Sequence, residues 1–170
     1  MDIDHFEKIV LSVKNKLFRF ALRMLGSQDD AKDVVQEVFI RVWNNRATAG
    51  DVRNWEAWCM RMARNLSLDR LRASARKPSL AIDESITLEQ QDPTPDTSAE
   101  LSESMTTVRE IMDALPEKQR QVMHLRDVEG YSYQEICEIL ELDMSQVKVN
   151  LFRARNAVRE KMLKIDAYGL

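Results

Sequence analysis

Apolar residues along the first part of the chain recur every three or four positions, which is the period of an amphipathic helix. A first helix is predicted over residues 6–25, and Gly26 ends it because glycine readily takes the left-handed conformation. A second helix is predicted over residues 29–44, a loop over 45–51 and a third helix over 52–72. Three amphipathic helices of this kind predict a compact bundle.

A second set of helical patterns fills the end of the chain. One helix is predicted from Leu101 to Leu115, and Pro116 restarts the chain at the first position of the next helix, where its missing N–H costs nothing. That helix is predicted to stop near Gly130. These apolar positions predict a second, separate group of helices.

A short helix, a tight turn and a longer basic helix are predicted after Gly130. Ser132 and Glu135 have the spacing of a capping box at a helix start. Residues 141–143 predict a tight turn, in which Asp143 can cap the last helix. The inner face of that helix is predicted to be Val147, Leu151, Ala154, Val158 and Met162. This order is the helix-turn-helix arrangement.

Composition supports an all-α fold, because only four Gly and four Pro occur in 170 residues and strand-rich folds need more turn residues. Charge divides the chain into three parts. Residues 1–77 carry a net charge of +5, residues 78–104 carry −7 with no basic residue, and residues 105–170 carry −1. We therefore expect two small helical domains, 1–77 and 105–170, joined by an acidic flexible linker.

The two cysteines, Cys59 and Cys137, lie in apolar patterns and match no metal-binding or redox spacing, so buried free thiols are expected. The N-terminus lacks the apolar core of a signal peptide, and no run approaches the roughly 18 apolar residues of a membrane span. We expect a soluble, cytoplasmic protein.

The last helix carries polar and basic side chains near its start. A helix fits the DNA major groove, where such side chains contact base edges and phosphates. The alternative is a terminal helix with a solvated basic face, which the capping box and the turn length make less favourable. The candidate residues are Gln146, Lys148, Asn150, Arg153 and Arg155.

The third helix interleaves aromatic and basic side chains, a mixture that holds single-stranded nucleic acid by base stacking and phosphate contacts. For the tryptophans alone, core packing is the alternative. The candidates are Trp55, Trp58, Arg61, Arg64, Asn65, Arg70, Arg72, Arg76 and Lys77.

The second helix has a polar face opposite its apolar stripe, and such a face is usually only solvated. It consists of Asp33, Gln36, Glu37, Ile40, Arg41 and Asn44. Elsewhere we find no catalytic triad, paired catalytic carboxylates, glycine-rich phosphate loop or metal-ligand spacing. We therefore expect neither an enzyme nor a cofactor.

Four motifs together resemble the sigma-70 family, and within it the small extracytoplasmic-function (ECF) type. Two resemble region 2: DDAKDVVQEVFIRVW at residues 29–43 and WCMRMARNLSLDRLR at 58–72. Two resemble region 4: LPEKQRQVMHLRDVEGYSYQEICEIL at 115–140 and VKVNLFRARNAVR at 147–159. The resemblance implies a dissociable subunit that binds core RNA polymerase and directs it to promoters.

The resemblance also gives each candidate surface a role. It implies that the residues docking on the clamp helices of the polymerase β′ subunit are Asp33, Gln36, Glu37, Ile40 and Arg41. The loop 49–54 and the third helix match the part that captures an unstacked −10 base and holds the melted strand, with Asn54, Trp55, Trp58, Arg61, Arg64, Asn65 and Arg72 as its candidates. The −35 element would be read by Ser145, Gln146, Lys148, Asn150, Arg153 and Arg155. The polymerase β flap is a further expected contact, and the acidic linker resembles the segment that extends toward the RNA-exit path.

Two departures from the family pattern matter. Ser145 and Gln146 stand where the family often has Gly-Thr, and Val149 stands where small polar residues are common, so base preference at −35 does not transfer. No long C-terminal extension is present, so we expect regulation from outside the chain, with an anti-sigma factor as a possible partner. The alternatives are an autonomous DNA-binding regulator and a helical protein that binds no nucleic acid. The pI near 5.5 favours the sigma factor, because it predicts weak DNA binding without polymerase.

Overall fold

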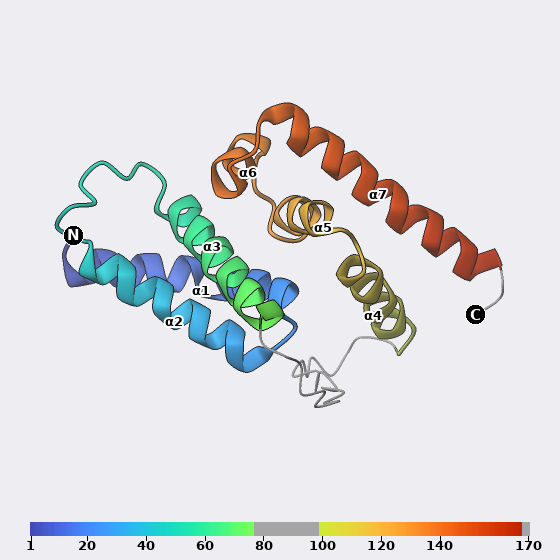
Figure 1. Cartoon of the computed structure of the whole chain (residues 1–170), viewed down its shortest axis with the longest axis horizontal. Coiled ribbons are helices and arrows are strands. Elements are labelled where there is room, and N and C mark those ends of the chain that lie inside the picture. Colours follow the sequence, from blue (N-terminus) through green and yellow to red (C-terminus); the bar gives the residue numbers. More distant parts are fainter. Residues whose placement is uncertain (77–98, 168–170) are drawn as a thin grey trace.

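The computed structural model describes residues 1–76 and 99–167, with side chains described from residue 103 onward in the second range. Every regular element in these two ranges is helical, which confirms the all-α prediction (Figure 1). Residues 78–98 of the predicted acidic linker, and the candidate Lys77, lie outside the described residues.

The N-terminal helices form a three-helix bundle in which each helix contacts the other two. They are α1 (Ile3–Leu25), α2 (Gln28–Asn44) and α3 (Trp55–Arg76). Asp2 and Ser27 cap the first two helices through their side chains. Gly26 ends α1 with a φ of 69°, so the predicted left-handed stop is confirmed.

The C-terminal helices pack around the long last helix. They are α4 (Ala99–Asp113), α5 (Glu117–Met123), a π-helical turn (His124–Val128), α6 (Tyr133–Leu140) and α7 (Met144–Ala167). Both bonds of the predicted capping box form at α6: Glu135 N–H donates to the Ser132 hydroxyl, and Ser132 N–H donates to the Glu135 carboxylate, each at 3.1 Å. The predicted short helix, turn and long helix are therefore present.

Several predicted helix boundaries differ from the structure: the helices predicted over 6–25, 52–72 and 101–115 are Ile3–Leu25, Trp55–Arg76 and Ala99–Asp113. The third helix begins at Trp55 rather than residue 52. The side-chain oxygen Oδ1 of Asn54 accepts a hydrogen bond from the Ala57 N–H and so caps the helix at this point. Pro116 is the N-cap of α5 and not its first helical residue. The predicted stop near Gly130 is confirmed, because the helical segment ends at Val128 with Glu129 as its C-cap, but its last residues, His124–Val128, form a π-helical turn rather than an α-helix.

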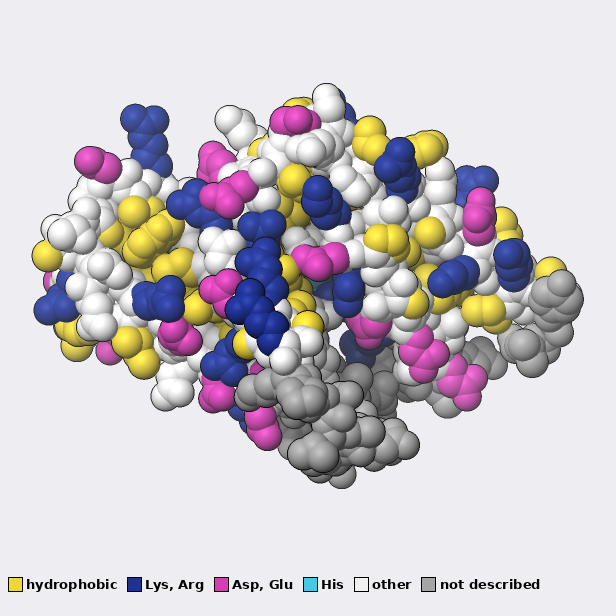
Figure 2. All heavy atoms as spheres, viewed as in Figure 1, with side chains coloured by type: hydrophobic (Ala, Val, Ile, Leu, Met, Phe, Trp, Pro, Cys, Tyr) yellow, Lys and Arg dark blue, Asp and Glu magenta, His cyan; other side chains and the backbone are white. Residues whose placement is uncertain are grey.

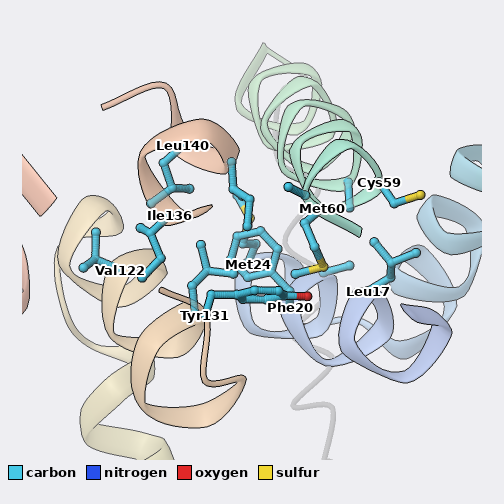
Figure 3. Close-up of a cluster of buried hydrophobic side chains, with 14 of the residues drawn as sticks. Leu17, Phe20, Met24, Cys59, Met60, Val122, Tyr131, Ile136 and Leu140 are labelled. Carbon is cyan, nitrogen blue, oxygen red and sulfur yellow. The ribbon is translucent and has the colours of Figure 1, made fainter. Parts of the chain in front are cut away.

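The buried apolar side chains form one cluster that crosses from the N-terminal to the C-terminal helices (Figure 3). Phe20 and Met60 from the N-terminal bundle lie in this cluster together with Tyr131 and Ile136 from the C-terminal helices. Helices α3 and α6 make the most extensive contact between the two groups. Burial of apolar surface therefore holds the two groups of helices together, as well as holding each one folded.

Both cysteines are free; Cys59 is buried as predicted, but Cys137 is only half-buried. Burial raises the pKa of the Cys59 thiol to about 12, with the Glu56 carboxylate adding to the shift, so this thiol stays protonated at neutral pH. Among the helices of residues 1–76 and 99–167, none is long and apolar enough to cross a membrane.

Candidate nucleic-acid and protein-binding surfaces

The predicted −10 residues gather at the start and along one side of α3; we call them the α3 face. Lys and Arg side chains cluster over this helix in the space-filling view (Figure 2). Trp55 and Trp58 are half-buried, and their rings pack edge to face with centroids 5.3 Å apart. Each ring contributes to packing and keeps some exposed surface, and a role of these tryptophans in nucleic-acid binding stays a prediction.

Asn54 connects the α3 face to the C-terminal helices. Its side-chain oxygen caps α3, and its amide Nδ2 donates to Glu135 Oε2 of α6 at 3.2 Å. Burial alone would raise the pKa of the Glu135 carboxyl, but hydrogen bonds from Ser132 and Asn54 outweigh it and lower the pKa. Glu135 is therefore a carboxylate that holds the predicted base-capture residue.

The arginines of the α3 face differ in their burial and in the side chains that they contact. Arg61 is half-buried and lines a groove between the 51–58 segment and α6. Arg64 donates to Asn65 Oδ1 at 3.1 Å and lies 3.6 Å from the Glu141 carboxylate. Arg72 is exposed, and its NH1 atom lies 3.7 Å from the Asp69 carboxylate. The groove has a volume of about 660 Å³ and receives both Arg61 and Glu135.

The start of α7 presents the predicted −35 residues on the surface, but several of them also hold the helix together. Gln146 N–H donates to Asp143 Oδ1 at 2.8 Å, and Asp143 N–H donates to Gln146 Oε1 at 3.1 Å. This pair is a second capping box, and it confirms that Asp143 caps the helix. Asn150 Nδ2 donates to the Gln146 carbonyl at 2.8 Å. The side chains of Gln146 and Asn150 are therefore committed to the helix in this state.

Arg155 makes a two-pronged contact with Asp127, at 2.6 and 3.0 Å, and this bond raises the pKa of its guanidinium. Ser145, Lys148 and Arg153 are exposed. Val149 and Phe152 are among the exposed apolar residues of the same helix, with 43% and 67% of their surface accessible, and their exposure was not predicted from the sequence. The signal was available, because both fall outside the inner stripe of Val147, Leu151 and Ala154.

The predicted polymerase-docking residues lie along one side of α2; we call them the α2 face. Glu37 and Arg41 form an ion pair at 2.7 Å, one helical turn apart. Ile40 is 52% exposed and borders an apolar groove of about 480 Å³ between α1 and α2. The other residues that line this groove are Ile3, Phe6, Gln36, Phe39, Trp43 and Asn44. An exposed apolar groove of this kind is typical of a protein-binding surface.

No group of three or more His, Cys, Asp or Glu side chains in the described ranges could hold a metal ion.

Two protein-family models match the chain. The model of "Sigma-70 region 2" matches residues 9–77, which contain the α2 and α3 faces. The model of "Sigma-70, region 4" matches residues 105–158, which contain α6 and the start of α7.

Curated relatives and solved structures agree with these matches. The chain is 32% identical over 171 aligned residues to the ECF RNA polymerase sigma factor SigW of Bacillus subtilis, covering 95% of this chain and 90% of that protein. It is 27% identical to the ECF RNA polymerase sigma-E factor of Escherichia coli, covering 92% and 86%. Its fold is similar to that of the sigma factor RpoE crystallised with the anti-sigma factor NepR from Bartonella quintana, with a TM-score of 0.74, 24% identity, and coverage of 96% and 99%.

Proposed function

The chain belongs to the sigma-70 family of RNA polymerase sigma factors, in its ECF group, and we propose that the α2, α3 and α7 surfaces divide its contacts with polymerase and promoter DNA. As an ECF sigma factor it binds core RNA polymerase and directs transcription initiation. The observation that carries this function is the match to both sigma regions, in order, on two separate segments of the chain. We further propose that the protein performs no catalysis, needs no cofactor and acts in the cytoplasm with the polymerase.

Core polymerase would bind at the α2 face. A partner helix can lay apolar side chains into the groove beside Ile40, while the Glu37–Arg41 ion pair on the same helix sets orientation. The partner that fits is the coiled-coil clamp helices of the β′ subunit, with the β flap contacting the C-terminal helices. An anti-sigma factor would compete for the same faces.

The melted −10 strand would bind at the α3 face. Trp58 is half-buried and keeps exposed surface that a base could contact, and Arg61 and Arg64 supply positive charge for phosphates. Extruding a base from the duplex costs a few kcal/mol, so a preformed groove beside Asn54 lowers the barrier to melting.

The −35 element would bind at the start of α7. Lys148 and Arg153 are exposed and available for phosphates and base edges, and Ser145 lies at the end of the helix that enters the groove. The exposed Val149 and Phe152 add apolar surface suited to thymine methyl groups.

The direct test is co-elution of the full chain with core RNA polymerase, followed by run-off transcription of sheared genomic DNA. Stable co-elution with discrete new transcripts is the expected result. If the folded chain does not bind a core enzyme of matched bacterial origin, an autonomous DNA-binding regulator becomes the better description.

Charge reversal separates the polymerase-binding surface from the rest. Glu37→Lys should weaken core binding about tenfold or more, because it reverses a charge of the α2 face and repels Arg41. Glu7→Lys makes the same change at an exposed position of α1 and should bind normally. Equal binding by both variants would show that the α2 face is only solvated.

Truncation separates the predicted DNA-reading residues. Arg153→Ala should reduce promoter affinity by about 1–3 kcal/mol and relax −35 base preference. Arg159→Ala removes an exposed arginine from the same helix, two turns further from its start, and should leave base preference intact. Unchanged preference in Arg153→Ala would remove Arg153 from the recognition surface.

A further inference from the structure

His124 lies at a contact between the two groups of helices. It begins the π-helical turn, and only 1% of its side chain is exposed. Its ring packs against Phe20 of α1 with centroids 5.6 Å apart, and its Nδ1 atom accepts a hydrogen bond from Arg23 Nε of the same helix at 3.2 Å. A titratable side chain is therefore buried between segments that lie 101 positions apart in sequence.

The hydrogen bond from Arg23 determines which protonation state of the ring fits. A guanidinium donates and cannot accept, so Nδ1 of His124 must offer a lone pair. The single proton of the neutral ring is then on Nε2, which lies 3.4 Å from the Glu129 carboxylate. A second proton would have to sit on Nδ1, where it would face the Arg23 N–H. The packed arrangement therefore accepts the neutral ring and opposes the protonated one.

The charged groups around this ring already balance one another. From α1, Arg19 donates twice to Glu129, at 2.6 and 2.8 Å. Arg23, also from α1, forms an ion pair with Asp113 of α4 at 2.8 Å. Because each cation has its own carboxylate, a protonated His124 would add a positive charge without a counter-ion of its own. Such a charge is costly at a site where the side chains of His124 and Glu129 are each only 1% exposed.

We propose that His124 makes the contact between the two groups of helices sensitive to pH: protonation of its ring breaks the bond from Arg23 and releases the C-terminal helices from α1. Once released, the ring is solvated and binds its second proton without opposition from Arg23. Acid therefore favours the separated arrangement. This inference goes beyond the proposed function, because the free chain would respond to acidification by itself, whichever surfaces bind polymerase and DNA.

The direction and size of the response follow from proton linkage. In the packed chain, burial lowers the pKa of His124, and the cations Arg23 and Arg19 lower it further against the opposing effect of Glu129. In the separated chain, the solvated ring returns to its ordinary pKa of 6.5. The packed state is therefore fully favoured above pH 6.5 and loses this advantage as the pH falls below it. With one proton per chain, the ratio of separated to packed molecules should rise by up to about tenfold between about pH 7.5 and 5.5.

The test measures the compactness of the full-length chain across this pH range. Small-angle X-ray scattering is coupled to size-exclusion chromatography, which removes associated chains near the pI of 5.5. The wild type is compared with His124→Asn, whose amide oxygen can accept from Arg23 and whose side chain does not titrate. His5→Asn removes the other histidine, which is exposed on α1, and is the matched control. Circular dichroism verifies the helix content of each variant at each pH.

A second background makes a small population of separated chains measurable. Each variant is also made with Tyr131→Phe, which removes the 2.9 Å hydrogen bond from the Tyr131 hydroxyl to Glu56 of α3. This bond joins the two groups of helices, so its loss should raise the separated population at every pH. The substitution leaves Arg19, Arg23 and Glu129 in place around His124.

We expect a pH-dependent expansion that requires His124. In the Tyr131→Phe background, the radius of gyration should be larger at about pH 5.5 than at pH 7.5, with helix content unchanged and with full reversal at pH 7.5. His5→Asn should expand in the same way, whereas His124→Asn should have the same radius at both pH values. If His124→Asn does not fold, Arg23→Gln replaces it. The glutamine oxygen can accept from a protonated ring, so the expansion should again be lost.

Three results would overturn the proposal. They are a radius that does not increase with acid in either background, an expansion that persists in His124→Asn or in Arg23→Gln, and an expansion that occurs only with loss of helix content. Neither scattering nor circular dichroism involves polymerase or DNA. Failure of the proposal would therefore leave the sigma function standing, and core-polymerase binding tests that function separately.

Discussion

His124 is the residue whose environment is most sensitive to pH. Its side chain is 1% exposed, packs against the Phe20 ring with centroids 5.6 Å apart, and accepts the Arg23 hydrogen bond at Nδ1. The proton of the neutral ring is therefore on Nε2, which lies 3.4 Å from the Glu129 carboxylate. Burial lowers the pKa of His124, and the cations Arg23 and Arg19 lower it further against the opposing pull of Glu129.

Acidification should therefore destabilise the packed molecule in two steps. A histidine whose folded pKa lies below its ordinary value of 6.5 stabilises the fold fully above that pH, and the stabilisation is lost as the pH falls below it. Burial would raise the pKa of Glu129, but Arg19 and His124 lower it to about 2, so its contribution persists until the pH falls below 4.5. Thermal denaturation between about pH 7.5 and 5 should show the His124 step alone.

His124→Asn isolates this step, because asparagine keeps an acceptor near Arg23 and does not titrate. The variant should lose most of the fall in melting temperature between about pH 7 and 5. His5→Asn removes the only other histidine, which is exposed on α1, and should retain the fall. A pH dependence that survives His124→Asn would assign the effect to another group.

For Gln146, the sequence predicted an exposed side chain but not its role in capping α7. Its position near the start of a basic helix correctly predicted an exposed residue. The spacing from Asp143 to Gln146 is also that of a capping box. One side chain can satisfy both patterns, so the pattern alone does not separate a structural role from a DNA-binding role.

Two substitutions separate these roles of Gln146. Gln146→Glu preserves the acceptor for the Asp143 N–H, so stability should not change, but the added negative charge should weaken promoter binding. Gln146→Ala should lose about 0.5–1 kcal/mol of stability and should also bind more weakly. Denaturant titration and promoter anisotropy are measured together. Normal promoter binding by Gln146→Glu would mean that this end of α7 stays away from DNA phosphates.

At the scale of elements, the helices were largely predictable because apolar periodicity and end signals agree in most of them. Gly26, Ser132 and Asp143 all act as helix ends where the sequence predicts them. The π-turn at His124–Val128 was not predicted from the local pattern, and it lies where His124 and the following Glu129 contact α1. The local sequence pattern therefore predicts the α-helices but not the π-turn, which lies at a contact between distant parts of the chain.

The α2 face gives an element-scale prediction about a single exposed side chain. Ile40→Lys should reduce core polymerase affinity about tenfold with little change in stability, because Ile40 is 52% exposed and borders the apolar groove. Leu11→Lys makes the same change at a residue of α1 that is 73% exposed and lies outside that groove. Sedimentation with core polymerase should distinguish the two variants. Equal affinities would mean that the groove is not the docking surface.

At the scale of the whole molecule, the sequence predicted two groups of helices but not that they pack together. The pairs Arg19–Glu129 and Asn54–Glu135 join positions 110 and 81 residues apart. Such pairs leave no periodic signal in one sequence, since each partner looks like an ordinary surface charge or amide. The division of charge along the chain is visible in sequence, whereas the pairing of these charges appears only in the fold.

This packing predicts that the wild-type chain unfolds as one cooperative unit. All three tryptophans, Trp43, Trp55 and Trp58, lie in the N-terminal bundle, so their fluorescence reports that bundle while far-UV circular dichroism reports every helix. Because the buried cluster crosses both groups, the two signals should change at the same urea concentration.

Breaking the long-range ion pair should uncouple these signals. Arg19→Glu leaves the buried Glu129 opposite a like charge, which should cost the packed state about 1–3 kcal/mol after allowing for the half-exposed position of Arg19. The circular dichroism transition should then begin at lower urea than the tryptophan transition, because the C-terminal helices lose their contact with α1 first. Lys14→Glu reverses an exposed charge on the same helix and should keep the transitions coincident. Separate transitions in the wild type would mean that the two groups of helices fold independently and that their contact adds little to stability.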